Sequence, residues 1–291
     1  MDKMKDVVIG FITGYEFDKL KPWIHSLNRS GFTGDKILVV YDISYEVAAQ
    51  IQNEGITVIG LGKDEENKKF VFNEPFNIVV SRFFHLWHLM RSFDKKYRYV
   101  ITTDVADVVF QRNPSEWLEN NLGDKKICVG SENLRYKDEE WGINNMYQSF
   151  GHAATGYMLE KGIYNAGTLA GEFDTFVDLC YNIYLVSKGA PMHVYGGGGP
   201  DQAALNLLLS LEPYKSITKF NTHDDEWSCQ CGTTVDPNKV KEFRKTFLVD
   251  VEPTWHDDTT VTNSKNEKYV LVHQYNRVPE WNEKILQKYA I

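Results

Sequence analysis

Two aspartates follow a short apolar segment near the middle of the chain, and no other stretch limits the possible fold as strongly. Residues Tyr99–Thr103 are rich in β-branched side chains, which is the pattern of a strand buried on both faces. Asp104 follows directly, and Asp107 comes three residues later. Because a carboxylate cannot ionise in a dry core without a partner, we expect both at the carboxyl end of a central parallel strand, where open α/β sheets bind ligands.

This pair of aspartates favours a metal site. Two hard oxygen ligands at such an edge suit Mg²⁺ or Mn²⁺ bridging a diphosphate, so we expect Asp104 and Asp107 to bind a divalent cation. The alternative is an Asp that caps a turn and a second Asp on the surface, because Asp is a common turn residue.

Strand and helix patterns alternate through the first part of the chain. Strands are expected at residues 6–13, 36–41 and 56–61, with helices between them at 17–30 and 44–54. This order is typical of a parallel, Rossmann-like sheet flanked by helices. A chain of 291 residues is long enough for one large α/β domain or two small ones, and we expect a single domain over 1–291.

Composition and charge exclude several function classes. The chain has 32 Lys and Arg against 40 Asp and Glu, a net charge of −8, and no block rich in Lys or Arg. A nucleic-acid partner is therefore not expected. The amino terminus lacks the apolar region of a signal peptide, and no apolar run is long enough to span a bilayer. We expect a cytoplasmic protein without a membrane span, or a trimmed piece of a longer protein.

The second half of the chain holds further elements and polar motifs. We expect helices at 78–93, 171–188 and 202–211 and strands at 126–131, 247–251 and 268–272, and the polar-aromatic segment 138–150 is either a sugar-facing loop or a surface helix. Four glycines precede Pro200-Asp201-Gln202, and they are not a P-loop because no Gly-Lys-Ser/Thr follows. Asp201 could serve only as a helix N-cap.

Taken in chain order, these motifs resemble the GT-A glycosyltransferases. Asp104-Val-Ala-Asp107 is similar to their Asp-x-Asp metal motif, with a wider spacing. Asn165-Ala-Gly167 resembles their Asn-x-Gly element, and Asp201-Gln202 and His273 resemble residues that such enzymes place at the donor sugar and the metal. The resemblance implies a GT-A (Rossmann-like), mostly parallel sheet flanked by helices, with an irregular C-terminal elaboration.

The resemblance also implies roles for individual residues. Mn²⁺ or Mg²⁺ would be bound by Asp104, Asp107 and His273. The nucleotide-sugar would be contacted by Thr13, Tyr15, Asp42, Arg82, Asp104, Gly167, Gln202 and Arg277. The catalytic residues would be Asp201 and Asn165. The nucleotide would lie in the half at about 1–135, and the donor sugar and acceptor in the half at about 136–291.

The implied function is a metal-dependent glycosyltransferase. It would move a sugar from a nucleotide-diphosphate donor, with UDP-sugars favoured, to a glycan or other hydroxyl acceptor. The set of motifs is more typical of retaining families, whereas inversion would need a general base such as Asp201 or Glu132. Two alternatives remain: a sugar-phosphate nucleotidyltransferase, which shares the parallel sheet and acidic metal pair, and a sugar-binding module without catalytic activity.

Overall fold

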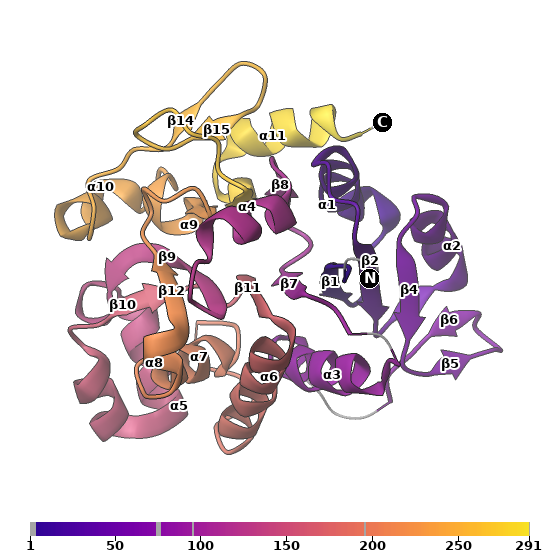
Figure 1. The fold of residues 1–291 in the computed structure, drawn as a ribbon, viewed down its shortest axis with the longest axis horizontal. Helices are drawn as coiled ribbons and strands as arrows, with labels where there is room; N and C mark the ends of the chain where they lie inside the picture. Colours follow the sequence, from indigo (N-terminus) through magenta and orange to yellow (C-terminus); the bar gives the residue numbers. More distant parts are fainter. Residues whose placement is uncertain (1–3, 74–76, 95, 195, 291) are drawn as a thin grey trace.

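A mixed eight-stranded sheet forms the middle layer of the molecule (Figure 1). The computed structural model describes residues 4–73, 77–94, 96–194 and 196–290. The strands of the main sheet are β1 (Val7–Ile12), β2 (Asp35–Val40), β4 (Thr57–Gly60), β7 (Tyr99–Thr103), β9 (Ile127–Arg135), β10 (Gly162–Tyr164), β11 (Thr168–Glu172) and β12 (Thr218–Asn221). They run in the order β10-β9-β11-β7-β1-β2-β4, with β12 beside β9. The strand before the two aspartates, β7, is therefore central, as expected.

The pairing of the strands confirms the Rossmann-like half and adds an antiparallel insertion. Strand β1 pairs in parallel with β2 and β7, and β2 with β4. Strand β11 runs antiparallel between β7 and β9. The sequence pattern gave no sign of β11: its residues, Thr-Leu-Ala-Gly-Glu, include small ones of weak strand propensity, and we assigned part of them to the following helix. That helix, α6 (Phe173–Lys188), begins later than expected.

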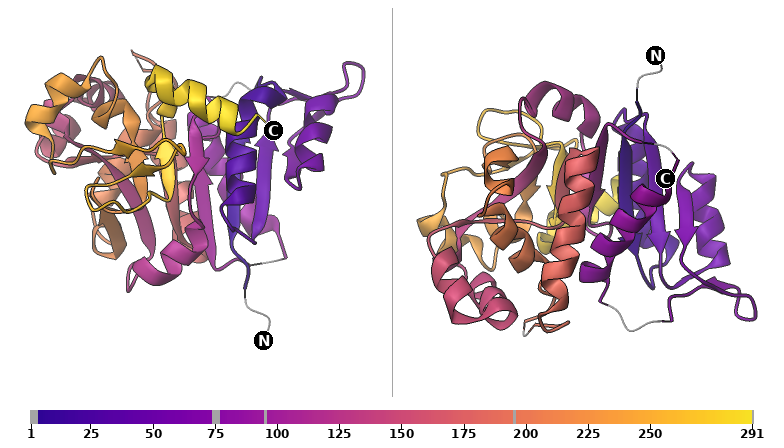
Figure 2. Two further views of the ribbon diagram at one scale, coloured as in Figure 1. Left: turned by 90° about the horizontal axis from the view of Figure 1, so that it is seen from above. Right: turned by 60° about the horizontal axis from the view of Figure 1, so that its bottom comes forward.

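Helices cover both faces of the sheet. One face packs against α1 (Phe17–Arg29), α2 (Tyr45–Asn53) and α4 (Pro114–Asn121), and the other against α3 (Ile78–Ser92), α6 and α7 (Asp201–Leu209). Successive residues of β1 alternate between the layers, since Val8 and Ile12 join the first core and Val7 and Ile9 the second. Figure 1 places α3 and α6 side by side, and Figure 2 shows α11 (Pro279–Lys288) beside α1 on the opposite side.

Three small sheets and several short helices complete the chain. The sheets are β13 (Ser228–Gln230) with β16 (Leu271–His273) and β8 (Val108–Phe110); β14 (Thr254–Trp255) with β15 (Val261–Thr262); and β3 (Ile43–Ser44) with β6 (Lys69–Phe70) and β5 (Lys63–Asp64). The short helices are α8 (Tyr214–Ile217), α9 (Cys231–Thr234), α10 (Val240–Phe243), η1 (Tyr136–Asp138), η2 (Arg244–Thr246) and η3 (Tyr275–Arg277). Across the described ranges, no helix is both long and apolar enough to cross a membrane.

Two expectations for the second half need comment. The strand expected at 247–251 is wrong: the segment is irregular, and the side chain of Asn133 bonds both Val249 N (3.0 Å) and Val249 O (2.8 Å) in place of a partner strand. Segment 138–150 is largely helical, within α5 (Glu140–Met158). That helix is broken at Gly151, whose φ of 75° requires a residue without a side chain.

A buried ion pair joins β1 and β7 at the edge of the sheet opposite the two aspartates. The carboxylate of Asp6, 7% exposed, accepts from Arg98 Nε at 3.1 Å and Nη2 at 2.8 Å, and from Tyr99 N at 3.0 Å. The outer Nη1 of Arg98 pairs with Glu119, which is 46% exposed. Asp6 therefore depends on Arg98 for its charge balance, whereas Glu119 can rely on water.

We predict that Arg98→Met lowers the free energy of unfolding by about 3 kcal/mol, because it leaves a buried carboxylate without its counter-charge. The matched control Glu119→Gln removes only the exposed partner and should cost less than about 1 kcal/mol. Urea denaturation measures both values. Equal stability losses in the two variants would contradict a special role for the buried half of the pair.

Candidate functional site

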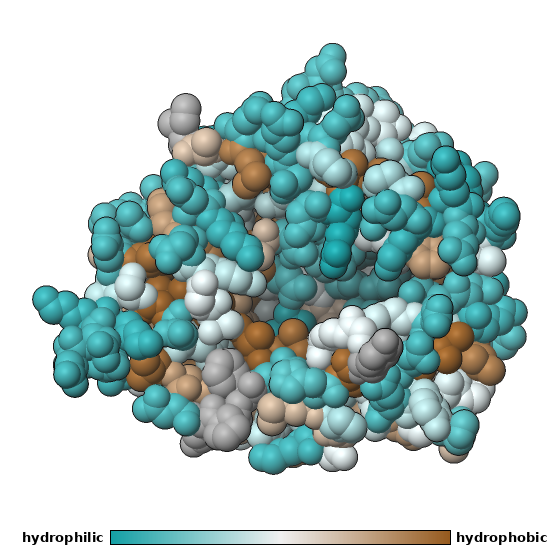
Figure 3. Space-filling view, turned by 180° about the vertical axis from the view of Figure 1, so that it is seen from behind, coloured by the Kyte–Doolittle hydropathy of each residue, from teal (hydrophilic) through white to brown (hydrophobic). Residues whose placement is uncertain are grey.

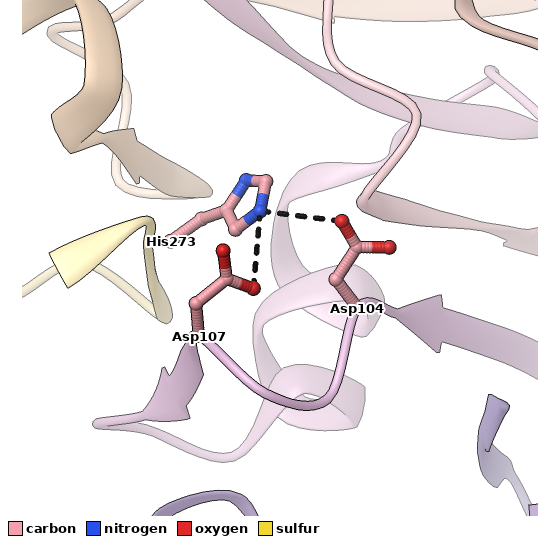
Figure 4. Close-up of side chains that lie close together, drawn as sticks. All are labelled: Asp104, Asp107 and His273. Atoms are coloured by element: carbon pink, nitrogen blue, oxygen red, sulfur yellow. Dashed lines mark ion pairs between the residues drawn. The ribbon is translucent and has the colours of Figure 1, made fainter. Parts of the chain in front are cut away.

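The loop after β7 and the end of β16 bring two carboxylates and an imidazole together. Residues Val108–Phe110 form β8, which pairs antiparallel with β16 so that His273 lies opposite Val108. His273 Nε2 thereby lies 3.4 Å from Asp104 Oδ2 and 3.6 Å from Asp107 Oδ1 (Figure 4). One ligand atom from each residue falls within 4.8 Å of the others. The three residues proposed as metal ligands thus form one cluster.

The chemistry of this cluster fits a divalent cation. His273 is 1% exposed, and its Nε2 makes no hydrogen bond to any of the described residues. Its Nδ1 lies 2.8 Å from Gln230 Oε1, so a proton on Nδ1 leaves the lone pair of Nε2 facing the carboxylates. Two carboxylate oxygens and one imidazole nitrogen are acceptable ligands for Mn²⁺ or Mg²⁺, with positions left for phosphate oxygens and water.

The charges in the cluster influence one another strongly. Burial alone would raise the pKa of Asp104, but the Arg82 guanidinium and His273 outweigh burial and hold that pKa below its usual value. Burial and the charge of Asp104 raise the pKa of Asp107. Burial would lower the pKa of His273, yet Asp107 and Asp104 raise it above its usual value. Protons therefore compete with a metal ion here, because ligands must be deprotonated to bind.

Arg82 is bound within the protein. Its guanidinium, buried at 8% exposure, pairs closely with Asp104, lies 3.2 Å from Asp201 Oδ2 and donates to Ala166 O at 3.2 Å. It therefore connects α3, the loop after β7, the loop before β11 and the start of α7. The expected contact between Arg82 and a diphosphate stays a prediction.

Asp201 is not a helix cap. It is the first residue of α7, Pro200 holds the capping position, and no side chain caps this helix. Its carboxylate instead pairs with Arg82. Burial raises the pKa of Asp201 to about 6, although Arg82 opposes this effect. The side chain thus belongs to the charged network of the site.

Two amide side chains and a glutamate form a second hydrogen-bond network beside the cluster. Asn165 Nδ2 and Gln202 Nε2 both donate to Glu132 Oε1, at 2.7 and 3.1 Å. Asn165 Oδ1 accepts from Gly167 N at 2.6 Å. A Cβ on Gly167 would lie 2.6 Å from Asp104 Oδ2 and 2.8 Å from His273 Cε1, so only glycine fits. The Asn-x-Gly turn is therefore packed directly against the cluster of Asp104 and His273.

A polar cavity of about 460 Å³ adjoins this network. It is lined by Glu132, Glu139, Trp141, Asn165, Gly196, Gly197, Gly198, Gln202, Gly232, Thr233, Asp236, Lys239, Gln274 and Arg277. The face in Figure 3 has a hollow of similarly hydrophilic character near its centre. Asn165, Gln202 and Arg277 were expected from sequence, whereas Thr233, Asp236, Lys239 and Gln274 were not. These four lie in the irregular C-terminal part, where no local pattern marks them.

The expected nucleotide contacts lie on the loops after β1 and β2. Gly14 N donates to Asp42 O at 2.7 Å, which joins the two loops. Burial and the nearby charges of Asp107 and Asp104 raise the pKa of Tyr15, which places this phenol in the field of the cluster. Asp42 pairs with Lys69 at 3.3 Å and is 55% exposed. Thr13, Tyr15 and Asp42 do not line the cavity, and their roles stay predictions.

Comparison with known proteins identifies the fold. No family model and no curated sequence matches the chain. Solved structures do: the galactosyltransferase LgtC in complex with donor and acceptor sugar analogues (TM-score 0.53, 13% identity, 98% of this chain and 95% of that one) is similar throughout. The glycosyltransferase GlyE of Streptococcus pneumoniae TIGR4 is also similar, with a TM-score of 0.56 and 14% identity over 99% of this chain and 61% of that one. The bifunctional glycosyltransferase WbbM has a TM-score of 0.54 and 14% identity over 99% of this chain and 52% of that one.

These similarities show a fold, and the fold is that of the GT-A glycosyltransferases. The chain spans nearly all of LgtC but only about half of WbbM and about three-fifths of GlyE. The mostly parallel core and the irregular C-terminal part expected from sequence agree with this fold.

We predict that Asp104→Asn and Asp107→Asn each abolish Mn²⁺-dependent binding of a nucleoside diphosphate while the fold persists, because an amide is a far weaker ligand for a hard cation than a carboxylate. Calorimetry with and without Mn²⁺ measures the effect, and circular dichroism tests the fold. Asp257→Asn, at an exposed position, is the control for the same change of charge. Unchanged affinity in both site variants would refute the metal assignment.

Proposed function

We propose that the protein is a metal-dependent glycosyltransferase that uses a nucleotide-diphosphate sugar, with UDP-sugars favoured. The observation that carries this proposal is the cluster of Asp104, Asp107 and His273, which lies beside the amide network of Asn165 at the carboxyl end of β7. The GT-A fold supports it, because chains similar in fold are glycosyltransferases.

Each part of the site has a distinct task in this proposal. Mn²⁺ or Mg²⁺ would neutralise charge on the departing diphosphate when bound. Asp104, Asp107 and His273 would hold the ion, and Arg277, an exposed cation on the cavity with no ion-pair partner among the described residues, would attract the phosphates. The loops bearing Thr13, Tyr15 and Asp42 would hold the nucleotide. In this proposal the nucleotide would lie in the half at about 1–135, and the sugar and acceptor in the half at about 136–291.

The sugar and the acceptor hydroxyl would lie in the polar cavity. Asn165 and Gln202 present amides there, and Trp141 adds an aromatic side chain to the same lining. An aromatic face suits the apolar face of a sugar ring, while amides bond its hydroxyls. Segment 138–150 is largely helical, which is the second of its two alternatives, and we propose that it nevertheless faces the sugar through Trp141.

We propose retention of configuration, because the set of motifs is more typical of retaining enzymes, and we keep inversion with Glu132 as its general base as the alternative. Inversion needs a general base in contact with the acceptor. Asp201 is bound to Arg82 and does not line the cavity, which makes it a poor base, whereas Glu132 does line the cavity. Burial raises the pKa of Glu132, and two amides donate to one of its oxygens. Proton NMR of the anomeric product distinguishes the two outcomes.

A panel of nucleotide-sugars with Mn²⁺ tests the proposed activity. We expect slow release of nucleoside diphosphate and free sugar from at least one donor, faster turnover with a hydroxyl acceptor, and loss of both with EDTA. Two results would contradict the proposal. Pyrophosphate release from a nucleoside triphosphate and a sugar 1-phosphate would identify a nucleotidyltransferase. Glycan binding that is indifferent to EDTA, with every donor intact, would identify a binding module.

We predict that Asp201→Asn slows transfer by about 100-fold or more, as expected when a charge is removed from a preorganised reaction centre, while nucleotide binding persists. The melting temperature should change little, because Asn still accepts from Arg82 and Arg82 keeps Asp104 as its counter-charge. Steady-state kinetics and calorimetry measure these effects. Asp178→Asn, which removes an exposed partner of Arg91, is the control. Full activity of Asp201→Asn would make Asp201 a structural residue only.

A further inference from the structure

The side chain of Gln230 is held rigidly against the proposed metal ligand His273. Strands β13 and β16 pair in parallel with Gln230 opposite His273. Gln230 Oε1 lies 2.8 Å from His273 Nδ1, and both residues are 1% exposed or less. The contact is therefore sealed from water, so water cannot substitute for Gln230 as a partner of Nδ1.

The orientation of this amide is determined by its other end. Gln230 Nε2 donates to Thr168 Oγ1 at 2.9 Å and to Ser228 Oγ at 3.1 Å, and both hydroxyls are buried. With the amino group held there, the carbonyl oxygen must face His273. Gly130 makes room for this arrangement, since a Cβ at that position would lie 1.9 Å from Ser228 Oγ and 3.4 Å from Gln230 Nε2.

We propose that Gln230 is a positioning residue that fixes the tautomer of His273, keeping the ring proton on Nδ1 so that Nε2 offers its lone pair between Asp104 and Asp107. A neutral imidazole carries one proton, and two carboxylates within 3.6 Å of Nε2 attract that proton to the wrong nitrogen. The carbonyl of Gln230 stabilises the alternative with the proton on Nδ1. This inference rests on the proposed metal site and adds to it the residue that prepares the histidine.

The tautomer can be observed directly in the metal-free protein. Long-range ¹H–¹⁵N correlation spectra distinguish protonated from bare ring nitrogens, and comparison with His273→Ala assigns the signal among the eight histidines. At alkaline pH, where the ring is neutral, we expect His273 to carry its proton on Nδ1. A proton on Nε2 in the wild-type protein would overturn the proposal without any change to Gln230.

Two substitutions at Gln230 separate positioning from packing. Gln230→Leu removes the acceptor, and we expect the proton to move to Nε2 and the affinity for Mn²⁺ alone to fall by about 10- to 100-fold, the usual effect of losing the partner of a metal-binding histidine. Gln230→Glu keeps an oxygen toward Nδ1, and the two hydroxyls can turn to donate to it. We expect Gln230→Glu to retain the Nδ1 proton. Its affinity for Mn²⁺ should be at least tenfold higher than that of Gln230→Leu.

A matched control excludes a general loss of packing. Thr234→Val removes a buried hydroxyl whose partners are His223 Nε2 and Gln230 O. It should lower the melting temperature without moving the His273 proton or the Mn²⁺ affinity. Gln230 is only structural if Gln230→Leu lowers the melting temperature but leaves the His273 proton and the Mn²⁺ affinity unchanged. It is also only structural if Gln230→Leu does not fold and Gln230→Glu loses the Nδ1 proton. A wild-type protein that binds no Mn²⁺ would instead refute the proposed metal site, and the spectrum would still decide the role of Gln230.

Discussion

The ion pairs of the buried Arg82 guanidinium with Asp104 and Asp201 are the interaction on which the arrangement of the site depends. The two carboxylates repel each other, and Asp201, 8% exposed, would cost several kcal/mol to bury alone, whereas Asp104 is 37% exposed. The guanidinium between them offsets part of the repulsion and of the burial cost, and it connects α3, the loop after β7 and α7. Among the described residues no arginine forms an ion pair with Asp107, and burial and Asp104 raise the pKa of Asp107. A divalent cation beside His273 would supply the positive charge that this side of the site lacks.

Close approach of backbone to side chains is the second constraint. Gly167 lies against Asp104 and His273, where a Cβ would collide with both. Gly130 leaves the space in which Ser228 and Gln230 meet. At both positions a Cβ would collide with the neighbouring side chains. These glycines are therefore required by packing around the site and not by turn geometry. The proposed metal ligands are thus oriented by close packing on the side of these glycines, which is what preorganisation requires.

Much of the fold and the identity of several site residues could be predicted from sequence. Apolar strand patterns ending in polar residues predicted β1, β2, β4 and β7, because side-chain periodicity and burial are local properties. The resemblance to GT-A enzymes implied that Asp104, Asp107 and His273 form one ligand set, and the structure brings the three residues together. Local patterns also gave two wrong predictions. Segment 247–251 has strand-like residues but pairs with no strand of the described chain. Strand β11 has residues of weak strand propensity but pairs with β7 on one side and β9 on the other.

By itself, the sequence determined which residues carry charge, which segments are apolar, and that an acidic pair follows a buried strand. Only the tertiary structure decided the partners of those groups. Arg82 is of a residue type that often binds phosphate, yet it forms ion pairs with Asp104 and Asp201, which lie in distant segments of the chain. Gln230 has no local signature, and it meets His273, 43 residues away, only because β13 pairs with β16 in one register. Register and long-range pairing depend on the whole core and not on any local window, so no pattern in the chain could have supplied them.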